Sequence, residues 1–183
     1  MQLVDAAEAA ASALVSGFVS KFAANDYGED LDEGIASSLN FLIANQLAEK
    51  PLKDVLDKYE TPRNAKTLCV SRVNPQIWDS LRAQQRNTDL KLQKVEKLMV
   101  KGLTAIATGA KEKELSTDQK NGVTSLAAAV FEMNMLRRDL IKPGLHEKFA
   151  ALCKPSIAVT EYLFGNDLTK HIKGIGEVIL LHK

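Results

Sequence analysis

Three groups of residues in this 183-residue chain have types that could do chemistry, but none has the spacing that its chemistry needs. The Gly174-Ile175-Gly176 run lacks the third glycine and the preceding strand of a dinucleotide-binding loop. His146 and Glu147 lack the second histidine, four residues after the first, that would place two zinc ligands on one helix face. Cys153 follows His146 by seven residues, about two helical turns, which is too far for a direct Cys–His contact. We therefore predict no catalytic residue, no metal ligand and no cofactor.

The cysteines and the apolar stretches indicate the compartment. Cys69 and Cys153 are 84 positions apart and belong to no Cys/His cluster, which is typical of isolated thiols in a reducing compartment. A structural disulfide between them is the alternative. Charged residues interrupt every apolar stretch before it reaches the roughly 20 residues that cross a bilayer, and residues 6–22 lack the basic start of a signal peptide. The sequence predicts an intracellular protein, cytoplasmic or nuclear, with no membrane partner.

Charge is unevenly divided along the chain, although the formal net charge is +1. Residues 1–60 carry −7 and residues 61–183 carry +8, and most of the positive charge lies within 61–113. Such a basic stretch can bind the phosphates of RNA or DNA without reading their sequence. It can equally pair with the acidic segment, within one chain or between subunits. The candidate phosphate contacts are Arg82, Arg86, Lys91, Lys94, Lys97 and Lys101.

The elements that must position these residues are helical, because apolar residues recur at intervals of three and four. This spacing predicts helices over about 2–24 and 31–50, and a short third helix that begins at Pro51. Asn74 and Pro75 then form a helix start, in which the Asn side chain caps free amides and Pro occupies the first turn.

Two long helices follow this start. One is expected over 76–108, with a bend near 87–89, and the second begins at the Ser116 capping signal and extends toward Leu140. At the end of the second helix, the charges of Arg137 and Arg138 favour a helix C-terminus. The pair predicts an antiparallel hairpin with a coiled-coil-like seam, within an all-α helical bundle.

The seam has two interpretations, intrachain core packing and a dimeric coiled coil, and four helices from two chains would satisfy both. Trp78 is expected to pack against the hairpin, with nucleic-acid stacking as the alternative role. The predicted seam residues are Trp78, Leu92, Val95, Met99, Leu103, Ile106, Val123, Leu126, Val130 and Met133.

Four regions follow from the pattern as a whole. Residues 1–60 form an acidic N-terminal helical segment, 61–74 an irregular linker, 75–176 the main helical domain, and 177–183 a frayed tail. The linker assignment rests on the loss of apolar periodicity, and on Pro62, which biases the residue before it toward an extended backbone.

An ordered series of motifs over about residues 30–175 resembles the gag-like proteins of DIRS-type retroelements, which move by a tyrosine recombinase. The order and spacing of the motifs carry the resemblance. They are Leu56-Asp57-Lys58-Tyr59 with Pro62-Arg63-Asn64, Val73-Asn74-Pro75-Gln76-Ile77-Trp78, Asp89-Leu90-Lys91-Leu92-Gln93-Lys94-Val95 with Lys101-Gly102, Arg137-Arg138-Asp139-Leu140-Ile141-Lys142-Pro143, and Phe149-Ala150-Ala151-Leu152-Cys153 followed by Val159-Thr160, Leu163-Phe164-Gly165 and Asp167-Leu168.

This resemblance implies a structural, self-associating protein without enzymatic activity, encoded by a mobile element. The C-terminal region of the alpha isoform of lamina-associated polypeptide 2 is similar, and it implies an all-helical coiled-coil dimer. The leading hypothesis is therefore a homo-oligomeric, capsid-like scaffold, either a dimer or a larger assembly. A nucleic-acid-binding module that uses residues 61–113, and an adaptor for a host nuclear protein, are the alternatives.

Overall fold

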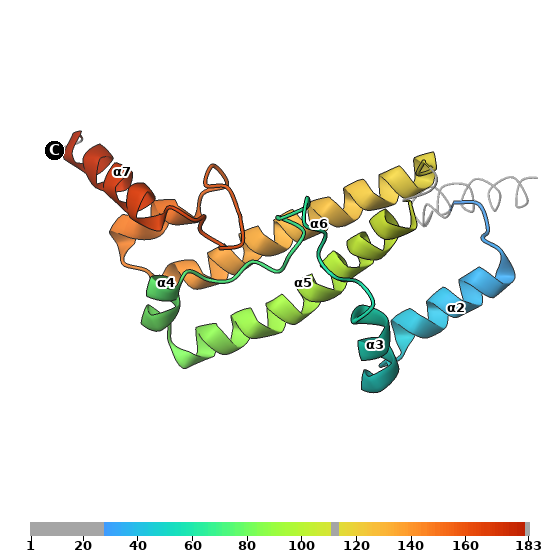
Figure 1. Ribbon diagram of the computed structural model, residues 1–183. Coiled ribbons are helices and arrows are strands. Elements are labelled where there is room, and N and C mark those ends of the chain that lie inside the picture. The colour runs from blue at the N-terminus through green and yellow to red at the C-terminus, as the bar shows by residue number, and fades with distance from the viewer. Residues whose placement is uncertain (1–27, 111–113, 182–183) are drawn as a thin grey trace, which may run out of the picture. The chain divides into compact units, whose positions relative to one another are not determined.

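The computed structural model describes residues 28–110 and 114–181, with side chains as far as 175 (Figure 1). Within these residues the secondary structure is helical, apart from one isolated parallel bridge between Arg72 and Tyr162. The predicted all-α class is confirmed. The chain divides into two compact units, residues 1–48 and residues 49–183. The helix expected over 2–24 lies outside the described residues.

In the first unit, α2 spans Glu33–Ala44. The Asp32 carboxylate caps it by accepting a hydrogen bond of 3.1 Å from the backbone amide of Ile35. The helix is shorter than the 31–50 predicted, because the backbone turns extended at Asn45. None of its residues is buried.

The second unit is built on a hairpin of two long antiparallel helices, α5 (Ala83–Gly109) and α6 (Thr117–Ile141), which pack along each other (Figure 1). Ser116 caps α6: its hydroxyl accepts from the amide of Gln119 at 3.2 Å, and the Gln119 side chain accepts from the Ser116 amide at 2.9 Å. The predicted hairpin is thus present. We call the end where α5 finishes and α6 begins the tip, and the opposite end the base.

The break in the first long helix is not where the sequence predicted it. A short helix, α4 (Pro75–Ser80), precedes α5, and the backbone is extended at Leu81 and Arg82. Leu81 is buried in the core, and the extended backbone there turns the chain from α4 into α5. The bend expected near 87–89 is absent, because Asp89 lies inside the continuous α5 helix and faces the hairpin interior.

Asn74 also has a different role from the capping role predicted. Its side chain makes no cap bond to α4. Instead, its amide nitrogen donates to the carbonyl of Gly165 at 2.8 Å, and its amide oxygen accepts from the backbone nitrogen of Phe164 at 3.1 Å. Gly165 has φ +75°, a conformation that L side chains rarely adopt, so this tight turn needs glycine.

The segment 61–74, which we interpreted as a linker, contains no helix but packs into the second unit. Ser71, Val73 and Asn74 are all buried. The preceding helix, α3 (Glu49–Leu56), is followed by Tyr59, whose carbonyl accepts a hydrogen bond from the Lys101 ammonium of α5. The 61–74 segment therefore folds back along the hairpin and forms part of the second compact unit.

The base of the hairpin holds the apolar core. There the chain continues into the 3₁₀ helices η1 (Lys142–Gly144) and η2 (Glu147–Cys153), and then into α7 (Leu168–Leu181). The helical backbone of α7 thus covers 177–181, part of the tail that we predicted to fray. The core residues, drawn from α4, α6, η2, α7 and the irregular segments next to them, are Val73, Ile77, Leu81, Ile141, Leu152, Cys153, Leu163, Phe164 and Leu168.

Candidate functional site

A buried ionic cluster around Arg137 joins both long helices to the 61–74 segment. The Arg137 guanidinium of α6 forms two hydrogen bonds with the Asp89 carboxylate of α5, with N–O distances of 2.7 and 3.2 Å. It also donates to the Glu96 carboxylate at 2.6 Å and to the Ser71 hydroxyl at 2.9 Å. Arg137 and Glu96 are completely buried, and Asp89 is 2% exposed.

Every group in this Arg137 cluster has a partner. Ser71 donates to Asn134 at 2.6 Å, and Gln93 donates to Asp89 at 2.6 Å. Among the described residues, no buried side-chain nitrogen or oxygen lacks a hydrogen bond. Burial raises the pKa of Glu96, and the Arg137 charge offsets only part of that rise. Because all its polar groups are buried and hydrogen-bonded, this cluster fixes the orientation of the two helices. Neither the Asp89 nor the Glu96 carboxylate is accessible to a substrate.

The neighbouring Arg138 holds the loop that follows η2. Its guanidinium donates to the backbone carbonyls of Leu163 at 2.6 and 2.9 Å, Lys154 at 2.9 Å and Ile157 at 2.8 Å. It also lies 5.6 Å from the centre of the Phe164 ring, close enough for a cation–π contact. Burial lowers the pKa of Arg138. Four charge-assisted bonds to carbonyls thus fix the 154–164 loop on α6.

Neither the Arg137 cluster nor the contacts of Arg138 were predicted from the sequence. The two adjacent arginines near a helix end were interpreted as favourable charges at the negative end of the helix dipole. One signal was available in α5. Asp89, Gln93 and Glu96 follow one another at intervals of four and three, so polar groups share one face of the helix. Polar residues on a seam face indicate a buried polar partner across it, since unpaired buried carboxylates are costly.

The two cysteines are separate thiols in the structure. Cys153 is buried in the core, and burial raises its pKa to about 11. Cys69 is half-buried, and its pKa is also raised, mainly by burial. In the part of the chain that the structure describes, no cluster of three potential metal ligands occurs. A search of the same residues for a helix long and apolar enough to span a bilayer finds none.

One of the predicted seam residues on α5, Val95, is turned out of the seam. Val95 is 45% exposed, whereas the next residue, Glu96, is completely buried. The exposure of Val95 follows from the Arg137 cluster, which holds Asp89 and Glu96 of the same helix inward. Of the other predicted seam residues, Leu103 is buried, and the half-buried ones are Trp78, Leu92, Met99, Ile106, Val123, Leu126, Val130 and Met133.

The predicted basic row divides into two groups. Lys91, Lys94 and Lys97 are exposed and line one shallow groove of about 590 Å³ on α5, which we call the lysine groove. The other three lie outside it: Arg82 is exposed beside the start of α5, Arg86 is half-buried, and Lys101 is bonded to the Tyr59 carbonyl. The lysine groove is also lined by Val70, Asn87, Leu90 and Gln93.

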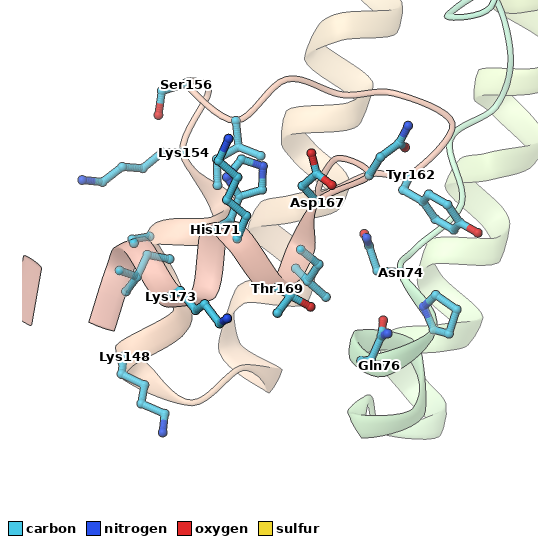
Figure 2. A pocket seen from close by; sticks show the side chains of 18 of the residues that line it. Asn74, Gln76, Lys148, Lys154, Ser156, Tyr162, Asp167, Thr169, His171 and Lys173 are labelled. Atoms are coloured by element: carbon cyan, nitrogen blue, oxygen red, sulfur yellow. The ribbon is translucent and has the colours of Figure 1, made fainter. Parts of the chain in front are cut away.

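A larger groove of about 1340 Å³ lies at the base, which the sequence did not reveal. Figure 2 shows Thr169 and Lys173 of α7 on one side of this base groove, and Asn74 and Gln76 on the other. Its basic lining residues, contributed by η2, the following loop and α7, are Lys148, Lys154, Lys170, His171 and Lys173, against the carboxylates of Glu147 and Asp167. Ile157, Leu168 and Ile175 add an apolar part to the lining. These residues lie at irregular spacings in the sequence, so only the fold gathers them.

Comparison with known proteins gives one match. A family model described as a domain of unknown function (DUF8747) matches residues 29–166. The match includes α2, the whole hairpin and both arginine clusters, and it ends just before α7. No curated protein and no solved structure matches the chain.

Proposed function

We propose that this chain, which belongs to the DUF8747 family, is a non-enzymatic structural protein that works by associating with copies of itself. The resemblance to gag-like proteins of retroelements supports this function. The observation that carries the proposal is the sparse burial of α6 toward the tip of the hairpin. All the buried residues of α6, namely Asn134, Arg137, Arg138 and Ile141, lie in its last eight positions, so Thr117–Met133 contains none.

The apolar side chains of that tip support pairing with a second copy. Val123, Leu126, Val130 and Met133 follow one another at helical spacing and are only half-buried. A second hairpin that packs against them would complete a four-helix arrangement and bury the remaining apolar surface. Burial of this kind contributes about 25 cal/mol for each Å² of apolar surface removed from water.

The α2 segment supports association independently. Its apolar side chains are exposed to solvent, and Ile43 is 83% exposed. The others on this short stretch are Leu31, Ile35, Leu39, Phe41, Leu42 and Leu47, each at least 36% exposed. Monomeric proteins rarely expose so many apolar groups together, and such patches mark interaction surfaces.

A pair of matched variants at the tip tests the proposal. The double change Val123→Asp with Leu126→Asp places two carboxylates on the half-buried face, whereas Ser125→Asp adds one on the exposed face of the same helix turn. We expect the wild type and Ser125→Asp to increase in mass with concentration, measured by sedimentation equilibrium. The double variant should remain monomeric with an unchanged helical circular dichroism spectrum, because carboxylates in an apolar interface are costly.

Two outcomes would contradict the proposal. A wild-type mass that equals one chain at all concentrations removes self-association altogether. A double variant that remains folded and associates as strongly as Ser125→Asp removes the tip from the interface.

Nucleic-acid binding is a second candidate function, favoured by the lysine groove. Lys91, Lys94 and Lys97 are neighbours on one exposed face, and none forms an ion pair within the described residues. Three lysines that contact single-stranded RNA predict a log–log salt slope of about −2. Fluorescence anisotropy with RNA should give this slope, and Lys91→Gln with Lys94→Gln should reduce its magnitude by more than half. A slope near zero would contradict this candidate.

A further inference from the structure

The base groove combines two features that together restrict its ligand. Four exposed lysines, Lys148, Lys154, Lys170 and Lys173, outnumber the two carboxylates in its lining. None of the four lysines forms an ion pair among the residues that the structure describes. Apolar side chains line the same space. A ligand that matches this lining has negative charges and apolar groups close together.

The groove is also built on fixed elements. Arg138 holds the loop that carries Lys154 and Ile157 by hydrogen bonds to both of their carbonyls, at 2.9 and 2.8 Å. The Asn74 side chain holds the opposite wall through its bonds to Phe164 and Gly165. A site whose walls are fixed before binding loses little conformational entropy when a ligand enters.

The segment with the matching chemistry lies in this same chain. Residues 29–35 read Glu-Asp-Leu-Asp-Glu-Gly-Ile, with four carboxylates and two apolar side chains in seven positions. Glu29, Asp30 and Glu33 are exposed, while the Asp32 carboxylate caps α2. Leu31 and Ile35 are 60% and 54% exposed. We call residues 29–35 the acidic segment.

Building on the proposed self-association, we propose that the acidic segment of one copy docks into the base groove of a second copy, through carboxylate–lysine pairs and the contact of Leu31 and Ile35 with the apolar lining. Such an interface joins two different surfaces, so repeated docking builds rings or open chains of molecules.

The position of α3 favours a second copy over the same chain as the occupant. The acidic segment joins the second unit through α3, and the Tyr59 carbonyl after α3 is bonded to Lys101. Lys101 lies 18 residues from the first residue of α5, Ala83, a distance of about 27 Å along the helix axis at 1.5 Å per residue. The helices α4 and α7, whose residues line the base groove, lie at the end of the hairpin where α5 begins (Figure 1). Docking between copies therefore does not require the chain to fold back over this distance.

Charge reversal on each side, followed by mixing, tests the proposal on the full chain. The groove variant carries Lys148→Glu, Lys154→Glu and Lys173→Glu, and the segment variant carries Glu29→Lys, Asp30→Lys and Glu33→Lys. All six side chains are exposed, so both variants should keep the wild-type circular dichroism spectrum. The matched control reverses Lys91, Lys94 and Lys97 to Glu, which changes the net charge by the same amount at the lysine groove.

We expect each reversed variant to associate about 10- to 100-fold more weakly than the wild type in 0.05 M salt, because like charges then face each other. The control should associate as the wild type does. Mixing the two variants should restore association, since one intact groove and one intact acidic segment meet in every mixed pair. Raising the salt to 0.5 M should weaken the wild-type contact.

The outcomes separate this proposal from the proposed function. If the wild type associates and both reversed variants associate equally well, docking in the base groove is wrong and association through the tip stands. Weakened variants that mixing fails to restore also overturn the docking contact, as does an equal loss in the control. A wild type that stays monomeric at every concentration overturns both proposals.

Discussion

The base and the tip of the hairpin are made by the same two helices, but they are stabilised differently. At the base, Arg137 and Arg138 are completely buried and the apolar core closes around Ile141, Leu163 and Phe164. Toward the tip, α6 has no buried residue before Asn134. The contrast indicates that α6 is packed most tightly at the base, whereas its apolar side chains toward the tip stay half-buried.

The two ends also differ in what fixes their geometry. The carboxylates of Asp89 and Glu96 restrict the base to the few arrangements that satisfy the Arg137 guanidinium, because a buried charge without its partner is costly. Apolar contacts at the tip carry no such directional requirement. We therefore expect the base to keep its geometry when a partner binds and the tip to adjust.

The largest expected effect comes from removing the charge at the centre of the base. Arg137→Met leaves two buried carboxylates without a counter-ion, so we expect the free energy of unfolding to fall by about 3–5 kcal/mol. Urea unfolding followed by circular dichroism at one fixed protein concentration measures it. The control Lys91→Met, on the exposed face of α5, should change stability by about 0.5 kcal/mol or less. A loss below about 1 kcal/mol for Arg137→Met would mean that the cluster does not stabilise the base.

A matched pair of leucine truncations compares the two ends with the same chemistry. Leu152 at the base is 1% exposed, and Leu126 near the tip is half-buried. We expect Leu152→Ala to cost about 2–5 kcal/mol, as in a closed core, and Leu126→Ala to cost about 1 kcal/mol or less in dilute protein. At high concentration the cost of Leu126→Ala should rise, because the association that we propose for the tip would add to stability. Equal costs at low concentration would remove the contrast between base and tip.

The smallest effect concerns pH. Burial holds the pKa of Glu96 above its usual value near 4.5, so between that value and the raised one the folded protein binds more protons than the unfolded chain. The contribution of Glu96 to stability therefore grows as the pH falls through the raised pKa, and it is complete below the unfolded value. Urea unfolding between pH 7 and pH 4 should show the wild type gaining stability relative to Glu96→Gln. A loss in this range would indicate that pairing with Arg137 outweighs burial.

Much of the architecture could be predicted from local patterns. The hairpin follows from apolar residues at intervals of three and four, and the start of α6 follows from the Ser116 capping box. The position of the helix break did not follow, because Ile77, Trp78 and Leu81 keep helical spacing up to it and no proline or glycine lies between Ser80 and Ala83. In the structure, Leu81 packs into the core at the extended turn between α4 and α5.

The candidate sites were less accessible to sequence reasoning. Lys91, Lys94 and Lys97 form a groove because residues three apart share a helix face, which spacing alone indicates. The base groove was not predictable, since Asn74, Lys148 and Lys173 lie between 25 and 99 residues apart in the chain.

By itself, the sequence determined the helical class, the two long helices and the opposite charges of the chain's two regions, because these depend on residues that are neighbours along a helix or simply on composition. The tertiary structure alone decided the roles of Arg137, Arg138 and Asn74. A charged or polar side chain can be exposed on a helix or buried in a core, and its role depends on whether partners from distant segments satisfy it. Here Asp89 and Glu96 reach Arg137 across the hairpin, and the carbonyls of Lys154, Ile157 and Leu163 surround Arg138.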